Sequence, residues 1–286
     1  MTETQATKTS KVRARAVPRT WTERIWRWVT IVTVTAVFGF LIAPLLIVAI
    51  ESFNSVNYLK FPIEGFSLKF YKAFFQDPRW LEAAFTSLRI AAVAALLATI
   101  IGVMGAWALS RTRSRSSGLV YALMYSPLVV PIIVLAIAFY FALLDLQLVG
   151  NWVAIAVIYS VLGIPYVLVA TSSALRYFDP DLENAARSLG ASPLKALWHV
   201  TFPQIISGIM GGAILAFILA FDEAIIILFV AGGGAVTLPR KLWDSLRYDL
   251  DPTLAVVGTL LIALFVALYV AYEVIRSVRQ RQRTKR

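Results

Sequence analysis

The sequence predicts an all-α polytopic membrane protein with six transmembrane helices. The chain has 286 residues, of which 59% are hydrophobic and only 15% are charged, and its mean hydropathy is +0.75. A soluble domain of this size does not solvate so much apolar surface. The charged residues gather in short stretches between long apolar runs, each able to cross a hydrocarbon core of about 30 Å.

The six expected spans are separated by loops and turns of uneven length. They lie at residues 28–50 and at about 84–109, 119–143, 152–174, 205–230 and 253–274. Pro127 and Pro131 fall inside the third span, and Pro165 falls inside the fourth. A proline within a span frees carbonyl groups that need internal partners. These three prolines are therefore either kinks that improve packing or hinges between conformations.

Basic residues gather on one side of this topology. With six spans, the basic tails 1–27 and 276–286 share a side with the 110–115 turn and with the loop 175–204. The opposite side, with the external loop 51–83, carries fewer basic residues, and acidic ones balance them. Because Lys and Arg are enriched in cytoplasmic loops, both termini are expected in the cytoplasm, and the protein in the inner (plasma) membrane. The net charge of +11 thus reports orientation, not nucleic-acid binding.

The stretch Asp181–Pro203, within the loop 175–204, is the longest polar interruption in the apolar second half of the chain. It predicts two short amphipathic helices joined at Gly190. Asp179 and Ser192 are the expected caps, and each is followed by a proline in the first helical position. Pro203 is expected to stop the second helix before the next apolar run. The alternative reading is an ordinary surface loop.

The same stretch resembles the cytoplasmic loop of ABC importer permease subunits. That loop has the pattern E-A-A, three residues, G, nine residues, I-x-L-P. The matching residues are Asn184, Ala185, Ala186, Gly190, and Val200 to Pro203. Asn184 stands where the family usually has Glu, and Glu183 is the nearest carboxylate. The resemblance implies that Glu183, Asn184, Ala185, Ala186, Gly190 and Pro203 belong to an ATPase-coupling loop.

A second set of residues resembles the spermidine/putrescine-type branch of this family. It consists of Ala43 to Leu46, Ser52 to Asn54, Phe66 to Ser67, Tyr71, Phe221 to Glu223, Gly232 to Gly234, and Thr237 to Pro239. The resemblance implies a type I ABC importer permease fold, in which residues 84–275 form a core of five transmembrane helices after one preceding span. It also implies a related second permease, an ATPase dimer and an external solute-binding protein.

The fifth span carries the residues that point most directly to transport. Gly208 and Gly212 form a G-x-x-x-G step, which lets helix backbones approach closely. Asp222 and Glu223 then lie inside the span, and ionisable residues at that depth are functional by default. On a continuous helix Glu223 shares a face with Gly212, while Asp222 lies about 100° away. The alternative is a pair of carboxylates that bond to neighbouring helices.

The chain itself is not expected to be an enzyme or to hold a cofactor or metal. It contains no G-x-x-x-x-G-K-[ST] sequence for ATP, so ATP and Mg²⁺ would be bound by the partner ATPase. It has no cysteine and a single histidine, His199. The predicted solute is a polyamine; the alternatives are an amino acid or opine, a phosphonate, or iron. An ion-coupled secondary transporter that relays protons through Asp222 and Glu223 is the competing class.

Overall fold

The computed structural model describes residues 21–112, 115–248 and 251–284. Most of the predicted basic tail 1–27, part of the 110–115 turn and the end of the tail 276–286 therefore lie outside the described residues. The chain divides into two compact units, Met1–Ile47 and Val48–Arg286. The helix α1 (Trp21–Glu51) carries the first expected span, and its final turn belongs to the second unit.

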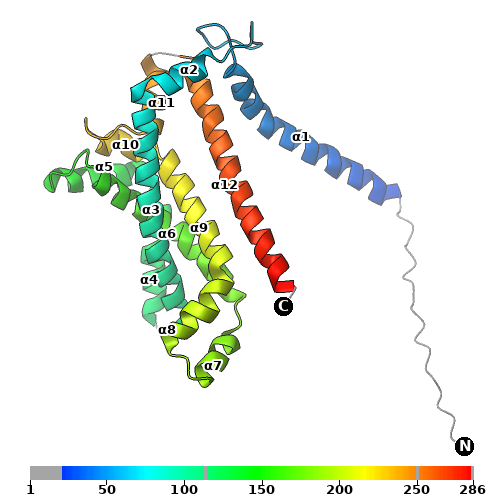
Figure 1. Ribbon diagram of the computed structural model, residues 1–286, viewed down its shortest axis with the longest axis vertical. Helices are drawn as coiled ribbons and strands as arrows, with labels where there is room; N and C mark the ends of the chain where they lie inside the picture. The colour runs from blue at the N-terminus through cyan, green and yellow to red at the C-terminus, as the bar shows by residue number, and fades with distance from the viewer. Residues whose placement is uncertain (1–20, 113–114, 249–250, 285–286) are drawn as a thin grey trace, which may run out of the picture. The chain divides into compact units, whose positions relative to one another are not determined.

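Three long helices pack side by side at the centre of the second unit (Figure 1). They are α3 (Pro78–Arg111), α6 (Trp152–Arg176) and α9 (Phe202–Asp222). A Cβ atom added to Gly102 of α3 would lie 2.7 Å from the Val167 Cβ of α6, and one added to Gly212 of α9 would lie 2.8 Å from the Val167 Cα. The close helix contact expected from the glycine step of the fifth span is therefore confirmed.

The remaining elements of the second unit lie at the two ends and along the sides of this bundle (Figure 1). α7 (Pro180–Ser188) and α8 (Pro193–Ala196) lie at one end, called here the α7 end. α2 (Lys69–Gln76) and α11 (Leu238–Tyr248) lie at the opposite, α2 end, and α12 (Thr253–Thr284) runs back along α9. Both α2 and α11 fall in segments that were expected to be loops.

The third expected span is broken at its two prolines into two helices and a short turn. α4 (Arg115–Tyr125) leads into the 3₁₀ turn η1 (Ser126–Leu128), and α5 (Ile132–Asp145) then continues at an angle of 97° to the preceding segment. The prolines explain the break, because Pro127 lies in the tight turn and Pro131, which has no backbone N–H, is the N-cap of α5. They therefore separate two helices instead of kinking one.

The described residues still match the predicted fold class. Five of their helices are long and apolar enough to cross a membrane, and the bent pair formed by α4, η1 and α5 makes a sixth if it is counted as one span. Within the described ranges the only extended pairing is an isolated bridge between Asn54 and Phe66. α6 is the most enclosed of the apolar helices, so the core lies around it and between α3 and α9.

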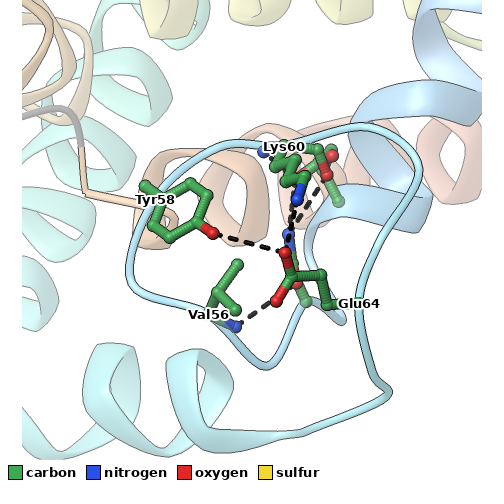
Figure 2. Close-up of polar contacts among 6 residues, drawn as sticks. Val56, Tyr58, Lys60 and Glu64 are labelled. Atoms are coloured by element: carbon green, nitrogen blue, oxygen red, sulfur yellow. Dashed lines mark hydrogen bonds and ion pairs between the residues drawn. The ribbon is translucent and has the colours of Figure 1, made fainter.

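The loop that follows α1 folds around a buried carboxylate. Glu51 accepts a hydrogen bond from the Asn54 side chain at 3.1 Å, and both residues are buried. Tyr58 and Lys60 both donate to Glu64 on the outer side of the loop (Figure 2). The hydrogen bond from Lys60 also lowers the pKa of Glu64. These contacts give the loop a defined shape.

Residues that carried the family resemblance meet in this loop. The Phe53 and Phe66 rings stack at 4.7 Å between centroids. The Ser52 and Tyr71 hydroxyl groups share a hydrogen bond of 2.8 Å. Because residues 52–54, 66 and 71 contact one another, the pattern quoted from the sequence corresponds to one structural unit at the α2 end.

Candidate functional site

The loop 175–204 begins with the helix α7, whose two ends are defined as the sequence predicts. The Asp179 carboxylate accepts the Asp181 N–H at 3.0 Å and caps the start. At the other end the Ala191 N–H donates to the Ala186 carbonyl and the Gly190 N–H to the Arg187 carbonyl. This is a Schellman motif, in which the residue after the cap adopts the left-handed conformation. Gly190 has a φ of +91°, so the predicted turn is confirmed.

Gly190 is required by backbone shape and not by a close neighbour within this chain. No atom of the described residues lies within 4 Å of the position that a Cβ would occupy there. L-residues other than Gly adopt this left-handed region only at a cost of roughly 1–2 kcal/mol. The strain of a substitution would therefore fall on the turn between α7 and α8.

The second half of the loop departs from the prediction. Ser192 caps α8 as expected, because its hydroxyl accepts the Lys195 N–H at 3.3 Å. Pro203, however, does not stop the helix: α8 continues through the π-helical turn η2 (Leu197–Thr201) into α9. The Phe202 N–H reaches back to the Leu197 carbonyl. The wider turn accommodates Pro203, whose missing N–H falls in the first turn of α9.

The two adjacent candidates in α7 face different surroundings. Glu183 is only 6% exposed. Its carboxylate pairs with Arg111, the last residue of α3, and accepts the Thr201 hydroxyl at 2.9 Å. Asn184 is exposed, and its side-chain amide donates to the Asp181 carboxylate of the same helix at 3.4 Å. The carboxylate is thus held inside the chain, while the amide remains on the surface.

The outer surface of the loop exposes apolar side chains. Leu189 is 90% exposed and Leu194 is 65% exposed. Tyr177, before α7, and Leu182, within it, are exposed as well. Several large apolar groups exposed along one short loop are typical of a surface that binds another protein. Ala185 is also exposed, and Ala186 is half-buried.

The fifth expected span is interrupted at its two acidic residues. α9 ends at Asp222, and Glu223 has an extended conformation before the short helix α10 (Ile225–Val230) begins. The Glu223 carboxylate accepts the N–H groups of Ile225 and Ile226 at 2.8 and 3.0 Å. The expected alignment of Glu223 with Gly212 was therefore wrong, since no continuous helix joins them. Glu223 instead caps α10.

Packing on both sides fixes this break. The Tyr159 hydroxyl of α6 donates to the Glu223 backbone carbonyl at 3.1 Å, which occupies an acceptor freed at the helix end. Ile226 and Ile227 of α10 are fully buried, and α10 packs on α5. Asp222 is exposed, and no hydrogen bond or ion pair within the described residues holds its carboxylate.

One charged residue in the apolar spans was missed by the sequence analysis. Arg89 lies within α3, and its guanidinium carbon is 4.8 Å from the centroid of the Trp152 ring. Its Nε atom is buried without a hydrogen-bond partner among the described residues. The signal was present, because an arginine in the predicted span 84–109 is costly. The partner, Trp152, is 63 positions away and could not be inferred from local pattern.

Comparisons with known proteins agree with this architecture. The sequence matches, over residues 98–281, the family described as binding-protein-dependent transport system inner membrane component. The putrescine transport system permease protein PotI of Escherichia coli (strain K12) is 35% identical over 267 residues, which cover 90% of this chain and 94% of PotI. The spermidine/putrescine transport system permease protein PotC of the same strain is 31% identical over 245 residues, or 84% of this chain and 91% of PotC.

A solved structure supports the fold separately. The chain is similar to a chain in the crystal structure of a bacterial ABC transporter involved in the import of the acidic polysaccharide alginate, with a TM-score of 0.67. The two chains are 14% identical, and the match covers 91% of this chain and 96% of that one. At this identity the likeness bears on the fold alone, and it confirms the fold class expected from the sequence.

Proposed function

Because the chain belongs to the family of binding-protein-dependent transport system inner membrane components, we propose that it forms part of the import path for a polyamine such as putrescine or spermidine. The observation that carries this proposal is its similarity to PotI and PotC along most of its length. Membership of the family makes it a multi-pass protein of the inner membrane. The proposal concerns the identity of the solute and the arrangement of the subunits.

The proposed transporter contains four further subunits: a second, related permease, two copies of an ATPase, and an external solute-binding protein. The description of the family as binding-protein-dependent supports the last of these. The sequence has no phosphate-binding loop, so ATP and Mg²⁺ are bound by the ATPase subunits and this chain is not an enzyme. The basic residues that flank the spans support the proposal that both termini and the loop 175–204 lie in the cytoplasm.

The loop 175–204 is the proposed contact with the ATPase. Its outer surface carries the exposed side chains of Asn184, Leu189 and Leu194, and Gly190 sets the angle between α7 and α8. The two leucines are exposed, so no element within the described part of the chain covers them. Docking of the ATPase there would bury them.

Asp222 is the stronger candidate for a contact with the solute. Its carboxylate is exposed and unpaired within the described residues, whereas the Glu223 carboxylate caps α10. Polyamines carry ammonium groups on flexible apolar chains, so an exposed acid without an ion-pair partner among the described residues suits them by charge pairing. The contact must be weak enough for the solute to leave again.

Uptake of radiolabelled putrescine and spermidine into vesicles containing the complete transporter tests this proposal. We expect uptake that requires ATP and the binding protein, persists when a protonophore collapses the proton gradient, and falls when unlabelled polyamine competes. Uptake driven by the proton gradient without ATP would contradict the importer mechanism in favour of a secondary transporter. ATP-dependent uptake of another small solute, with none of polyamine, would contradict the proposed solute.

Three variants of two neighbouring acids separate the effect of charge from the effect of capping. Asp222→Asn removes the charge of the unpaired acid, and we expect it to lower polyamine uptake. Glu223→Gln also removes a charge but keeps an oxygen that can accept the two α10 N–H groups, whereas Glu223→Ala removes the cap as well. We expect Glu223→Ala to reduce the amount of folded protein more than Glu223→Gln does. Normal uptake by Asp222→Asn would exclude Asp222 from the path.

A further inference from the structure

We propose that Arg111 is a positioning residue that ties the loop 175–204 to α3 through Glu183, so that α3 moves with the loop. The inference rests on the proposed function, because it assigns a transmission route to an ATPase-driven movement of that loop. In this proposal Glu183 makes a contact inside the chain and does not bind the ATPase. The carboxylate does not face the proposed ATPase surface but holds α7 against the helix bundle.

The contact is built from three elements that are distant in sequence. Arg111 ends α3, Glu183 lies in α7, and Thr201 lies in η2 at the start of α9. The guanidinium group and the Thr201 hydroxyl both donate to Oε2 of Glu183. The Glu183 side chain is 8% exposed and the Arg111 side chain 35%, so water screens the pair less than it would a surface ion pair.

This ion pair is the polar link from α7 to α3. Among the described residues, the other hydrogen bonds of α7 stay within the loop or lead to Thr201. The packing of α7 is chiefly against α8 and η2, which follow it in the chain. A force applied to the outer face of α7 therefore reaches α9 through the chain itself and reaches α3 through Arg111.

α3 is suited to carry such a movement across the protein. It is an unbroken helix of 34 residues that packs along both α6 and α9. At its far end the Ser87 hydroxyl accepts the Leu238 N–H at 2.8 Å. Lys241 of α11 also lies over the Trp80 ring, at 4.7 Å from its centroid. α3 thus joins the loop at the α7 end to α11 at the α2 end.

α9 lacks this continuity, because it starts in the π-helical turn η2 and ends at the break beside Asp222. The bent segment formed by α4, η1 and α5 is broken as well. A displacement of the loop would therefore be carried along α3 to the α2 end. The broken elements, α9 and the segment of α4, η1 and α5, can bend and need not follow it. The anchoring of α7 to α3 decides whether that displacement occurs.

The test is the ratio of solute transported to ATP hydrolysed by the complete reconstituted transporter, measured together with the amount of ATPase that co-purifies. We expect Arg111→Gln to lower this ratio by about fivefold or more, while the ATPase still co-purifies. Arg111→Lys keeps the charge and should retain most of the ratio. Lys72→Gln removes an exposed cation of α2 and is the control for charge loss alone.

A charge exchange gives a second, independent readout. Removing one partner of this partly buried pair leaves an uncompensated charge, so Glu183→Arg or Arg111→Glu alone should reduce the amount of assembled transporter. The double variant Arg111→Glu with Glu183→Arg restores the pair, and we expect it to exceed either single variant in assembly and in the transport ratio. This comparison decides the question if Arg111→Gln does not accumulate.

An unchanged ratio in assembled Arg111→Gln would overturn the inference, as would a fall in transport that merely follows the loss of co-purified ATPase. A double variant that does no better than the single variants would also overturn it. Failure of the proposed function looks different, because the unmodified transporter would then show no ATP-dependent polyamine uptake.

Discussion

The packing of α9 against α6 predicts that alanine substitution has different effects at two neighbouring glycines. A Cβ at Gly212 would lie 2.8 Å from the Val167 Cα and 3.2 Å from the Ala170 Cβ, and a backbone atom cannot move aside by changing a rotamer. A Cβ at Gly211 would meet nothing closer than the Tyr272 hydroxyl oxygen at 3.4 Å, an ordinary contact. Gly212→Ala must therefore push the helices apart, whereas Gly211→Ala need not.

The magnitude follows from the difference between the two variants. Both gain the same helix propensity, roughly 0.8–1.0 kcal/mol, so this term cancels. Overpacking a close contact costs about 1–3 kcal/mol, so Gly212→Ala should be less stable than Gly211→Ala by that amount, or about 5- to 150-fold in the folding equilibrium. Equilibrium unfolding of each variant in a denaturing detergent measures the difference. Equal stabilities would refute the close contact between α6 and α9.

Three other predictions concern single contacts. Gly190→Val should abolish uptake through the left-handed turn, and Gly190→Asn should do so less, because Asn tolerates that conformation better; equal uptake by both would contradict this. The hydrogen bond from Arg79 lowers the pKa of Asp77, so its stabilising effect should be complete above the ordinary pKa of about 3.9 and disappear as the pH falls through the lower folded value. Asp77→Asn should therefore reduce the fall of the melting temperature at acid pH, and an unchanged fall would contradict the assignment. A double-mutant cycle of Arg89→Met and Trp152→Leu should give a coupling of roughly 0.5–2 kcal/mol, and strictly additive effects would exclude the cation–π contact.

Local signals in the sequence were sufficient for the elements that local chemistry determines. Asp179 and Ser192 cap their helices, and Gly190 has the expected left-handed backbone. The glycines of the fifth span predicted a close helix contact, which Gly208 and Gly212 both make with α6. In each case the conformational or steric property of one residue type determines the local structure.

The breaks in the spans could not be located in the same way. The run 205–230 is apolar on both sides of Asp222, so periodicity alone predicted one helix. Only the tertiary structure shows that Tyr159 occupies the freed carbonyl of Glu223 and that α10 packs on α5. The prediction that Pro203 ends a helix was wrong for a related reason. The π-helical turn before it accommodates a proline that would end an ordinary α-helix.

The orientation of Glu183 likewise depended on a distant residue. Glu183 and Asn184 are adjacent in one short helix, and the pattern could not decide which of them faces outward. Arg111, 72 residues earlier, settles the geometry by pairing with Glu183. Because the pair joins the end of one expected span to a loop that comes two spans later, no local pattern encodes it.

Site-specific cross-linking tests the central claim most directly, namely that the loop 175–204 is cytoplasmic and receives the ATPase. The chain contains no cysteine, so Leu189→Cys and Tyr58→Cys each provide a single thiol on an exposed side chain at opposite ends of the second unit. With a thiol-attached photo-cross-linker in the assembled transporter, Leu189→Cys should cross-link to the ATPase subunit and Tyr58→Cys should not. In intact cells or spheroplasts, a membrane-impermeant thiol reagent should modify Tyr58→Cys alone. Cross-linking of the ATPase through Tyr58→Cys, or external labelling of Leu189→Cys, would contradict the account.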